Sequence, residues 1–191
     1  MSERAQRRMT VAEFLQWDDG TDTRYELVDG VAVAMAPPAH AHGRLSVRLG
    51  TRIEAALSAG HPQCSVQNDA SIALSEKGNS FYVADLAVSC MPIPDEAQLI
   101  QDPVLIVEIL SPSTSNFDRQ VKVPEYRRIV SVEEILLVDS RSIFAEVQRR
   151  VGEQWVHEIV QGRDASLTLH SIGLSLPMAE LYEGLDLAAV G

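Results

Sequence analysis

The chain has 191 residues, of which 46% are hydrophobic and 23% are charged, and this composition is typical of a globular protein with a substantial core. No run reaches the roughly eighteen apolar residues of a membrane span, and no apolar stretch of a signal peptide follows the charged start MSERAQRRMT, so we expect a cytoplasmic protein. The net charge of −11 argues against a broadly basic nucleic-acid-binding surface.

The first half of the chain is predicted to contain two helices, a hairpin and three strands. Thr10 and Glu13 have capping-box spacing and indicate a short helix near 10–17. The sequence RYELVDGVAVAM indicates a hairpin that turns at Asp29-Gly30. Apolar residues every four positions then predict a long helix over about 40–59. Strand-like runs follow at 64–67, 71–74 and 81–90.

The second half continues the alternation of strands and helices. PVLIVEILSP is the most apolar segment and indicates a central strand covered on both faces. A helix of roughly 117–130, containing Pro124, is expected next, and Pro177 opens a short helix in the tail. Strands are predicted at 135–139, 144–148 and 155–160. With no repeat or linker, this order predicts a single domain over 1–191 with a mixed sheet between helices, and no glycine-rich loop supports a Rossmann fold.

Cys64 and Cys90 are the two cysteines, and both lie in apolar, strand-like surroundings. They could form a disulfide, but we expect two separate buried thiols, as in cytosolic proteins. Neither lies near a second cysteine or a histidine at zinc-binding spacing, so no zinc site is expected.

Two carboxylates stand out because each lies within an apolar strand. Asp85 is inside FYVADLAV and Glu108 is inside PVLIVEIL, and a buried carboxylate is costly unless it is paired or binds a metal. One such residue is commonly half of a structural ion pair. Two on successive strands can share a cation that offsets their repulsion. Oxygen ligands of this kind suit Mg²⁺ or Mn²⁺, so a metal site is the alternative to structural ion pairs.

The segment after Glu108 adds three polar side chains. Asp118, Lys122 and Tyr126 have four-residue spacing, so they share one face if the segment is helical. A surface ion pair between Asp118 and Lys122 is one explanation of the pattern. In the catalytic interpretation, Lys122 points to the strand end that bears Glu108 and offsets charge on a phosphate under attack. Pro124 leaves the helical geometry open, because proline disfavours a helix interior.

Basic side chains of the long predicted helix are the candidate DNA contact. Arg44, Arg48 and Arg52 have four-residue spacing and align along one side of a helix. A row of solvated arginines explains this spacing equally well. His40 and His42 would project about 200° apart on a helix, so we do not expect them to share a metal ion.

Together these features resemble a known family. YELVDG near the start, a histidine before the long helix, Asp85 on its strand, VEILSPST and the pair Lys122 and Tyr126 resemble the Uma family. These are restriction-endonuclease-like proteins of the PD-(D/E)XK nuclease superfamily, and the resemblance covers about 10–181. It implies a restriction-endonuclease-like fold of the α/β (α+β) class, with a mixed β-sheet flanked by helices.

The resemblance also implies roles for individual residues. Asp85 and Glu108 would be metal ligands, joined by the backbone carbonyl of Ile109. Lys122 would replace the motif lysine, since Leu110 occupies its usual place two residues after Glu108. Ala84 stands where the superfamily has a proline before the aspartate. The remaining implied site residues are Glu26 as an acid near the metal, and His42, Asp118 and Tyr126 as accessory residues.

The leading hypothesis is a Mg²⁺- or Mn²⁺-dependent endonuclease that hydrolyses DNA phosphodiester bonds, works as a homodimer and has no membrane partner. The first alternative is a nuclease-fold protein that binds DNA or a protein without cutting, which the charge of −11 and the displaced lysine favour. The remote alternative is a glycosidase that uses Asp85 and Glu108 as its carboxylate pair. An aromatic content of 5% weighs against it, because sugar sites usually contain aromatic platforms.

Overall fold

A six-stranded mixed β-sheet forms the centre of the computed structural model, which describes residues 8–185 and 187. The strand order in space is β3 (Ser65–Ile72), β4 (Tyr82–Ser89), β5 (Pro103–Leu110), β6 (Glu134–Asp139), β7 (Phe144–Val151) and β8 (Gln154–Gln161). The β5–β6 pair is parallel and the other neighbouring pairs are antiparallel. The apolar segment predicted as a central strand is β5, and it lies between β4 and β6.

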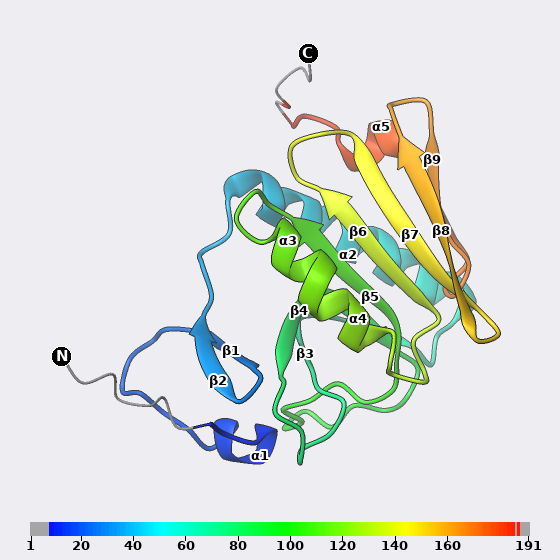
Figure 1. Cartoon of the computed structure of the whole chain (residues 1–191). Coiled ribbons are helices and arrows are strands. Elements are labelled where there is room, and N and C mark those ends of the chain that lie inside the picture. Colours follow the sequence, from blue (N-terminus) through cyan, green and yellow to red (C-terminus); the bar gives the residue numbers. More distant parts are fainter. Residues whose placement is uncertain (1–7, 186, 188–191) are drawn as a thin grey trace.

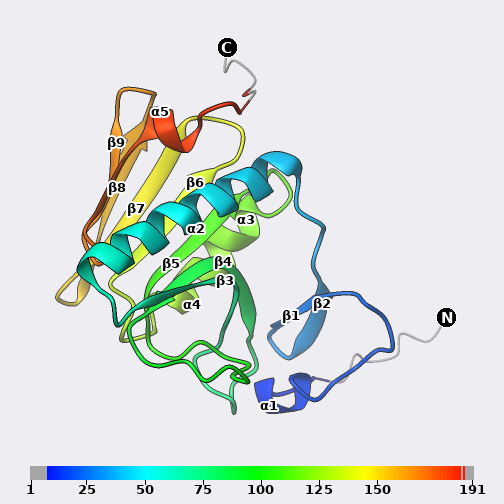
Figure 2. The ribbon, with the colours of Figure 1, turned by 180° about the vertical axis from the view of Figure 1, so that it is seen from behind.

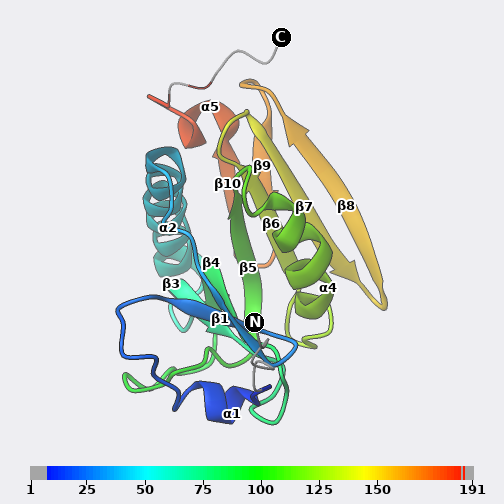
Figure 3. The same cartoon turned by 60° about the vertical axis from the view of Figure 1, so that its left-hand side comes forward.

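Helices cover both faces of this sheet (Figures 1 and 3). The long helix α2 (His40–Gly60) buries Leu45, Leu49 and Ile53, and Figure 2 shows it running across one face. A helical run of α3 (Ser115–Phe117), η1 (Asp118–Lys122) and α4 (Val123–Tyr126) covers the other face. Side chains of β5 therefore alternate between two cores, with Val107 on the α2 side and Ile106 on the α4 side. The predicted mixed sheet flanked by helices is confirmed.

The N-terminal elements attach beside the start of β4. Helix α1 (Val11–Phe14) begins with the predicted capping box between Thr10 and Glu13. Strands β1 (Tyr25–Val28) and β2 (Val31–Ala34) form the predicted hairpin. Asp29 and Gly30 take φ values of 48° and 83° in its turn, the left-handed region that such turns require. A β-bridge between Leu27 and Phe81 holds the hairpin against the central sheet.

The C-terminal segment contains a second hairpin that the sequence analysis did not identify. Strands β9 (Ser166–Leu169) and β10 (Leu174–Pro177) pair with each other, and Pro177 then opens helix α5 (Met178–Leu181), as predicted. Their apolar side chains join the core on the α2 side. Buried Glu134 of β6 accepts hydrogen bonds from the amides of His170 and Ser171, at 3.1 and 2.9 Å, and so fixes the hairpin. Among the described residues, no helix is both long enough and apolar enough to cross a bilayer.

Two element boundaries differ from the prediction. The runs 64–67 and 71–74 were expected to be separate strands, but both belong to β3, which pairs with β4 on both sides of Asp69. Asp69 has a φ of 51°, so the polar residues between the runs mark a local irregularity of one strand. The helix predicted over 117–130 spans 115–126, with its π-helical part before Pro124.

Cys64 and Cys90 form a disulfide, so the expectation of two separate thiols is wrong. Cys64 precedes Ser65, which pairs with Ser89, so the register places the two cysteines side by side across β3 and β4. The sequence could not show this, because strand register depends on which face of each strand the tertiary fold buries.

Leu49→Ala is expected to lower the free energy of unfolding by about 2–5 kcal/mol, because Leu49 is fully buried between α2 and the sheet. Urea unfolding followed by circular dichroism measures the change. The matched control is Val47→Ala on the same helix, where the residue is 72% exposed and a change below about 0.5 kcal/mol is expected. Equal losses in the two variants would contradict the assignment of this helix face to the core.

Candidate active site at the fork of strands β4 and β5

The two predicted metal ligands lie where strands β4 and β5 separate. The antiparallel ladder between them ends at the pair Leu86 and Val107, so Asp85 and Glu108 are the next facing residues and share one face of the sheet. Beyond the ladder, the backbone amide of Ile109 donates to Oδ2 of Asp85 at 2.6 Å. We call the cluster that surrounds these two carboxylates the strand fork. Besides Asp85 and Glu108 it comprises Glu26, His42, Asp118, Lys122 and Tyr126.

Glu26 reaches the strand fork from β1. Its Oε1 accepts a 2.9 Å hydrogen bond from the backbone amide of Val83, two residues before Asp85 on β4. The bridge between Leu27 and Phe81 brings β1 close enough for this contact. Glu26 is buried, and its role as an acid near a metal stays a prediction.

The ammonium group of Lys122 is buried at the centre of the strand fork. Its Nζ lies 2.9 Å from Oε1 of Glu26, 3.2 Å from Oε1 of Glu108 and 3.4 Å from Oδ1 of Asp118. It also donates to the carbonyl of Val83 at 3.1 Å. Burial opposes the charged form, but the three carboxylates outweigh it and raise the pKa of Lys122 above its ordinary value. A single cation thereby joins the hairpin, two sheet strands and the helical run.

The helical run positions Lys122 in spite of Pro124. The backbone amide of Val123 bonds to the carbonyl of Asp118, five residues earlier, which makes η1 a π-helical turn. Pro124 follows at the start of α4, where its missing amide hydrogen costs least. Asp118, Lys122 and Tyr126 do lie together, as their four-residue spacing predicted, and the Asp118–Lys122 ion pair is buried instead of exposed.

Glu108 lies in surroundings that disfavour its charge. Tyr126, fully buried, donates its hydroxyl to Oε1 of Glu108 at 2.6 Å. Burial is the main cause that raises the pKa of Glu108 well above its ordinary value, and the charges of Asp85 and Asp118 add to it against the opposing effect of Lys122. Burial also raises the pKa of Asp118. Negative charge at the strand fork is therefore only partly compensated.

His42 and Asp85 form the solvent-accessible side of the strand fork. Nε2 of His42 lies 3.0 Å from Oδ1 of Asp85, and their side chains keep 16% and 19% exposure. Lys122 and Glu108 keep 6% and 3%. Burial opposes protonation of His42, but its hydrogen bond to Asp85 and the nearby carboxylate charges outweigh burial and raise the pKa of the imidazole. A substrate would approach the strand fork from this side.

The side chains at the strand fork fit a divalent cation held largely by water. Four carboxylates surround one lysine and one histidine there: Glu26, Asp85, Glu108 and Asp118. In residues 8–185 and 187, no three or more His, Cys, Asp or Glu side chains are arranged as a ready-made metal cage. Mg²⁺ is commonly held by one or two carboxylates and keeps several waters, so Asp85 and Glu108 would be enough side-chain ligands for it. The carbonyl of Ile109 as a third ligand stays a prediction, since the contact observed there is made by its amide.

The predicted arginine row is aligned along α2, but two of its members hold the C-terminal segment. Arg48 donates to the carbonyls of Leu181 and Glu183 at 2.7 and 2.8 Å. Arg52 forms an ion pair with Glu180 of α5. The guanidinium groups of Arg48 and Arg52 therefore already have protein partners, and DNA binding by the three arginines stays a prediction.

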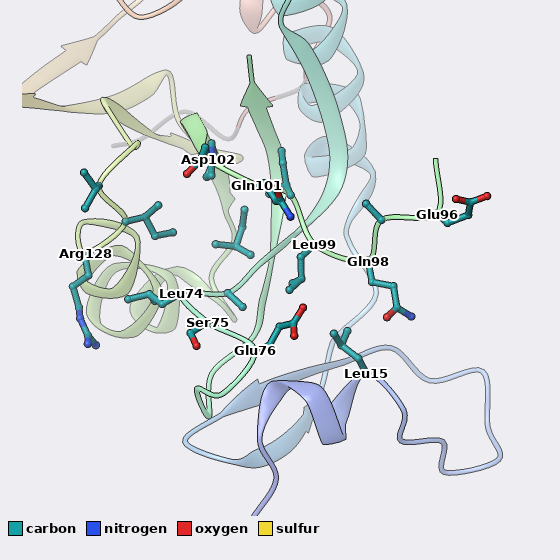
Figure 4. Close-up of a pocket in the computed structure, with 17 residues that line it drawn as sticks. Leu15, Leu74, Ser75, Glu76, Glu96, Gln98, Leu99, Gln101, Asp102 and Arg128 are labelled. Carbon is teal, nitrogen blue, oxygen red and sulfur yellow. The ribbon is translucent and has the colours of Figure 1, made fainter. Parts of the chain in front are cut away.

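The strand fork does not coincide with the cavity shown in Figure 4. That cavity has a volume of about 670 Å³ and is lined by Leu74, Leu99 and Arg128, among others. None of the predicted site residues lines it. The site residues predicted from the sequence thus form a partly buried cluster at the end of the β4–β5 ladder.

Two residues that contact or face the strand fork, Val83 and Asp69, were not predicted from the sequence. Val83 binds Glu26 and Lys122 through its backbone, which leaves no trace in side-chain identity. Asp69 lies opposite Asp85 in the β3–β4 register, and its charge helps to raise the pKa of His42. It falls between two runs that were predicted to be separate strands, so its position across from Asp85 could not be inferred.

Lys122→Met is expected to lower the free energy of unfolding by about 3–5 kcal/mol, because the buried carboxylates lose their shared cation. Urea unfolding at neutral pH in EDTA gives the value. Lys77→Met removes the same charge from an exposed position between β3 and β4, and a change below about 0.5 kcal/mol is expected for this control. If Lys122→Met proved as stable as the control, Lys122 would not be what holds the strand fork together.

Comparisons with known proteins place the chain in a family. The uncharacterized protein slr1290 of Synechocystis sp. is 33% identical over 181 residues, which are 93% of each chain. The uncharacterized protein sll1609 of the same organism is 28% identical over 163 residues, 83% of this chain and 91% of the relative. A crystal structure of a protein from Anabaena variabilis, described as a "putative nuclease belonging to DUF820", matches this chain with a TM-score of 0.71 and 20% sequence identity. The match covers 91% of this chain and 97% of the Anabaena chain, so the fold is nuclease-like. A family model described as "Putative restriction endonuclease" matches residues 11–179, and the chain therefore belongs to this family, Uma2.

Proposed function

We propose that the protein is a divalent-metal-dependent endonuclease that hydrolyses phosphodiester bonds in DNA. The observation that carries the proposal is the strand fork, where Asp85 and Glu108 face each other and Lys122 is bonded to Glu108. The family description and the nuclease-like fold support a nuclease. Proteins of the restriction-endonuclease-like kind generally use a divalent metal, and the excess of carboxylates over cations is consistent with Mg²⁺ or Mn²⁺.

Lys122 supplies a fixed positive charge next to the proposed metal ligands. A bound Mg²⁺ or Mn²⁺ would polarise the scissile phosphate and lower the pKa of an attacking water. The ammonium of Lys122 offsets negative charge that develops on the phosphate during attack. Because Glu26 and Asp118 hold this ammonium from two sides, it needs no rearrangement before the reaction.

The other residues of the strand fork act as positioning residues. Tyr126 orients Glu108 through its hydroxyl, and the amide of Ile109 orients Asp85. His42 holds the second oxygen of Asp85 on the accessible side. Cleavage of both strands of a duplex needs two such sites, so the proposal includes a homodimer. It also includes a cytoplasmic location, in which the Cys64–Cys90 disulfide would be an exception to the reduced cysteines that are usual there.

Binding of DNA without cleavage is the second candidate function. Leu110 occupies the usual position of the motif lysine and is buried, so no lysine of β5 projects toward the strand fork. Catalysis then depends wholly on Lys122, which reaches the site from another element. If Lys122 cannot replace the motif lysine, the protein binds metal and DNA and leaves the DNA intact.

Asp85→Asn and Glu108→Gln are each expected to slow plasmid nicking by ~10²–10³-fold or more, because each removes the charge of a metal ligand and keeps the side-chain shape. The assay follows the conversion of supercoiled plasmid to open circles by the full chain in MgCl₂ or MnCl₂. EDTA is expected to abolish nicking by the wild type.

The matched control is Asp164→Asn, which removes an exposed carboxylate and is expected to nick at the wild-type rate. Circular dichroism checks that each variant is folded. Undiminished nicking by either fork variant, or nicking that persists in EDTA, would contradict the proposed mechanism. DNA binding with no nicking by the wild type would favour the second candidate function.

A further inference from the structure

An open groove of about 910 Å³ runs along the first half of α2, and its lining is basic. The lining includes three arginines and a histidine, and no aspartate or glutamate. The whole chain has 27 acidic and 16 basic residues, so this surface departs from the overall charge. We call it the α2 groove, defined by His40, Gly43, Arg44, Val47, Arg48 and Arg52.

The arginines of the α2 groove differ in how their charges are compensated. Arg52 pairs with the carboxylate of Glu180. Arg48 is bonded to two neutral carbonyl groups, so its positive charge persists. Arg44 takes part in none of the ion pairs found in the described part of the chain. Its guanidinium lies beside Gly184 of the C-terminal segment, so Arg44 is the groove arginine that can move to a ligand without breaking an ion pair.

Two backbone features add to the attraction for anions. Ala39, the N-cap of α2, provides no side-chain cap, and no acidic residue lies in the first turn. No side chain of α2 itself therefore offsets the positive end of the helix dipole at this end of the groove. Gly43 costs about 1 kcal/mol relative to alanine within a helix. No atom lies within 4 Å of where its Cβ would be, so internal packing does not require glycine and the open space faces the groove.

The α2 groove and the strand fork begin at the same turn of α2. His42 faces the sheet and contacts Asp85, whereas His40 lines the groove on the other side of the helix. The helix that separates the two sites is about 10 Å across. At about 3.4 Å per nucleotide along one strand, this is a span of roughly three nucleotides.

We propose that the α2 groove binds the phosphate backbone of DNA a few nucleotides from the bond that is cut, with Arg44 as the phosphate contact. This inference rests on the proposed function, because the strand fork is what brings DNA to this turn of the helix. The uncompensated charges, the free helix end and the open shape suit an extended polyanion. An acidic chain can thus hold DNA through one local basic surface.

Arg44→Gln is expected to weaken binding of a short fluorescein-labelled duplex and to lower the slope of log Kd against log salt by about one unit. Fluorescence anisotropy of the full chain in CaCl₂ gives both values, and a gel confirms that the duplex stays intact. Arg44→Glu is expected to weaken binding further. Lys77→Gln, the same change of charge at an exposed position between β3 and β4, is expected to bind as the wild type does.

Arg48→Gln separates binding from stability. It is expected to lower the melting temperature because Arg48 anchors the C-terminal segment, whereas Arg44→Gln should melt as the wild type does. Arg44→Gln with wild-type affinity and salt slope would overturn the groove assignment, even if the wild type nicks plasmid. Weaker binding by Arg44→Gln with no nicking by the wild type would support the groove and contradict the proposed nuclease. If poly-L-glutamate competes as well as unlabelled duplex, the groove is a site for acidic polypeptides and the DNA assignment fails.

Discussion

The buried ammonium of Lys122 is the contact on which the site depends. It binds Glu26 from the hairpin, the Val83 carbonyl and Glu108 from two sheet strands, and Asp118 from its own helical run. Burying one lysine requires oxygen partners on several sides, and burying three carboxylates requires a cation among them. The hairpin bridge at Phe81 and the π-helical turn before Pro124 both serve this requirement, because each brings one of the partners to the ammonium group.

Local patterns in the sequence predicted most of the elements and singled out the carboxylates of the candidate site. The hairpin turn at Asp29-Gly30, the apolar face of α2 and the continuous apolar run of β5 are encoded within single segments, and Asp85 and Glu108 stood out because charged residues are rare in such strands. The β9–β10 hairpin, the Cys64–Cys90 disulfide and the position of Asp69 depend on register and on packing between distant segments. The periodicity of apolar residues within one segment contains no information about strand register or about packing between distant segments. The same holds for Lys122, whose spacing indicated a shared helix face but not that it would be buried.

Charge is distributed unevenly in ways that the net value of −11 conceals. At the strand fork, carboxylates outnumber cations. Burial raises the pKa of Glu108, and the nearby charges of Asp85 and Asp118 raise it further. A divalent cation at Asp85 and Glu108 would relieve this excess. On the outer side of the same helix turn, the α2 groove has basic residues and no acidic ones. The proposed cation site and the proposed anion-binding surface would therefore lie on two sides of one helix turn.

The central claim is that the strand fork is a divalent-metal site. Calorimetric titration of MnCl₂ into the metal-free full chain tests it most directly, with Asp85→Ala as the comparison and Asp164→Ala as the control outside the strand fork. One binding event per chain is expected in the wild type and in the control, and its loss is expected in Asp85→Ala. Equal binding by Asp85→Ala and the wild type would contradict a metal site at the strand fork, because Asp85 would then contribute nothing to metal binding.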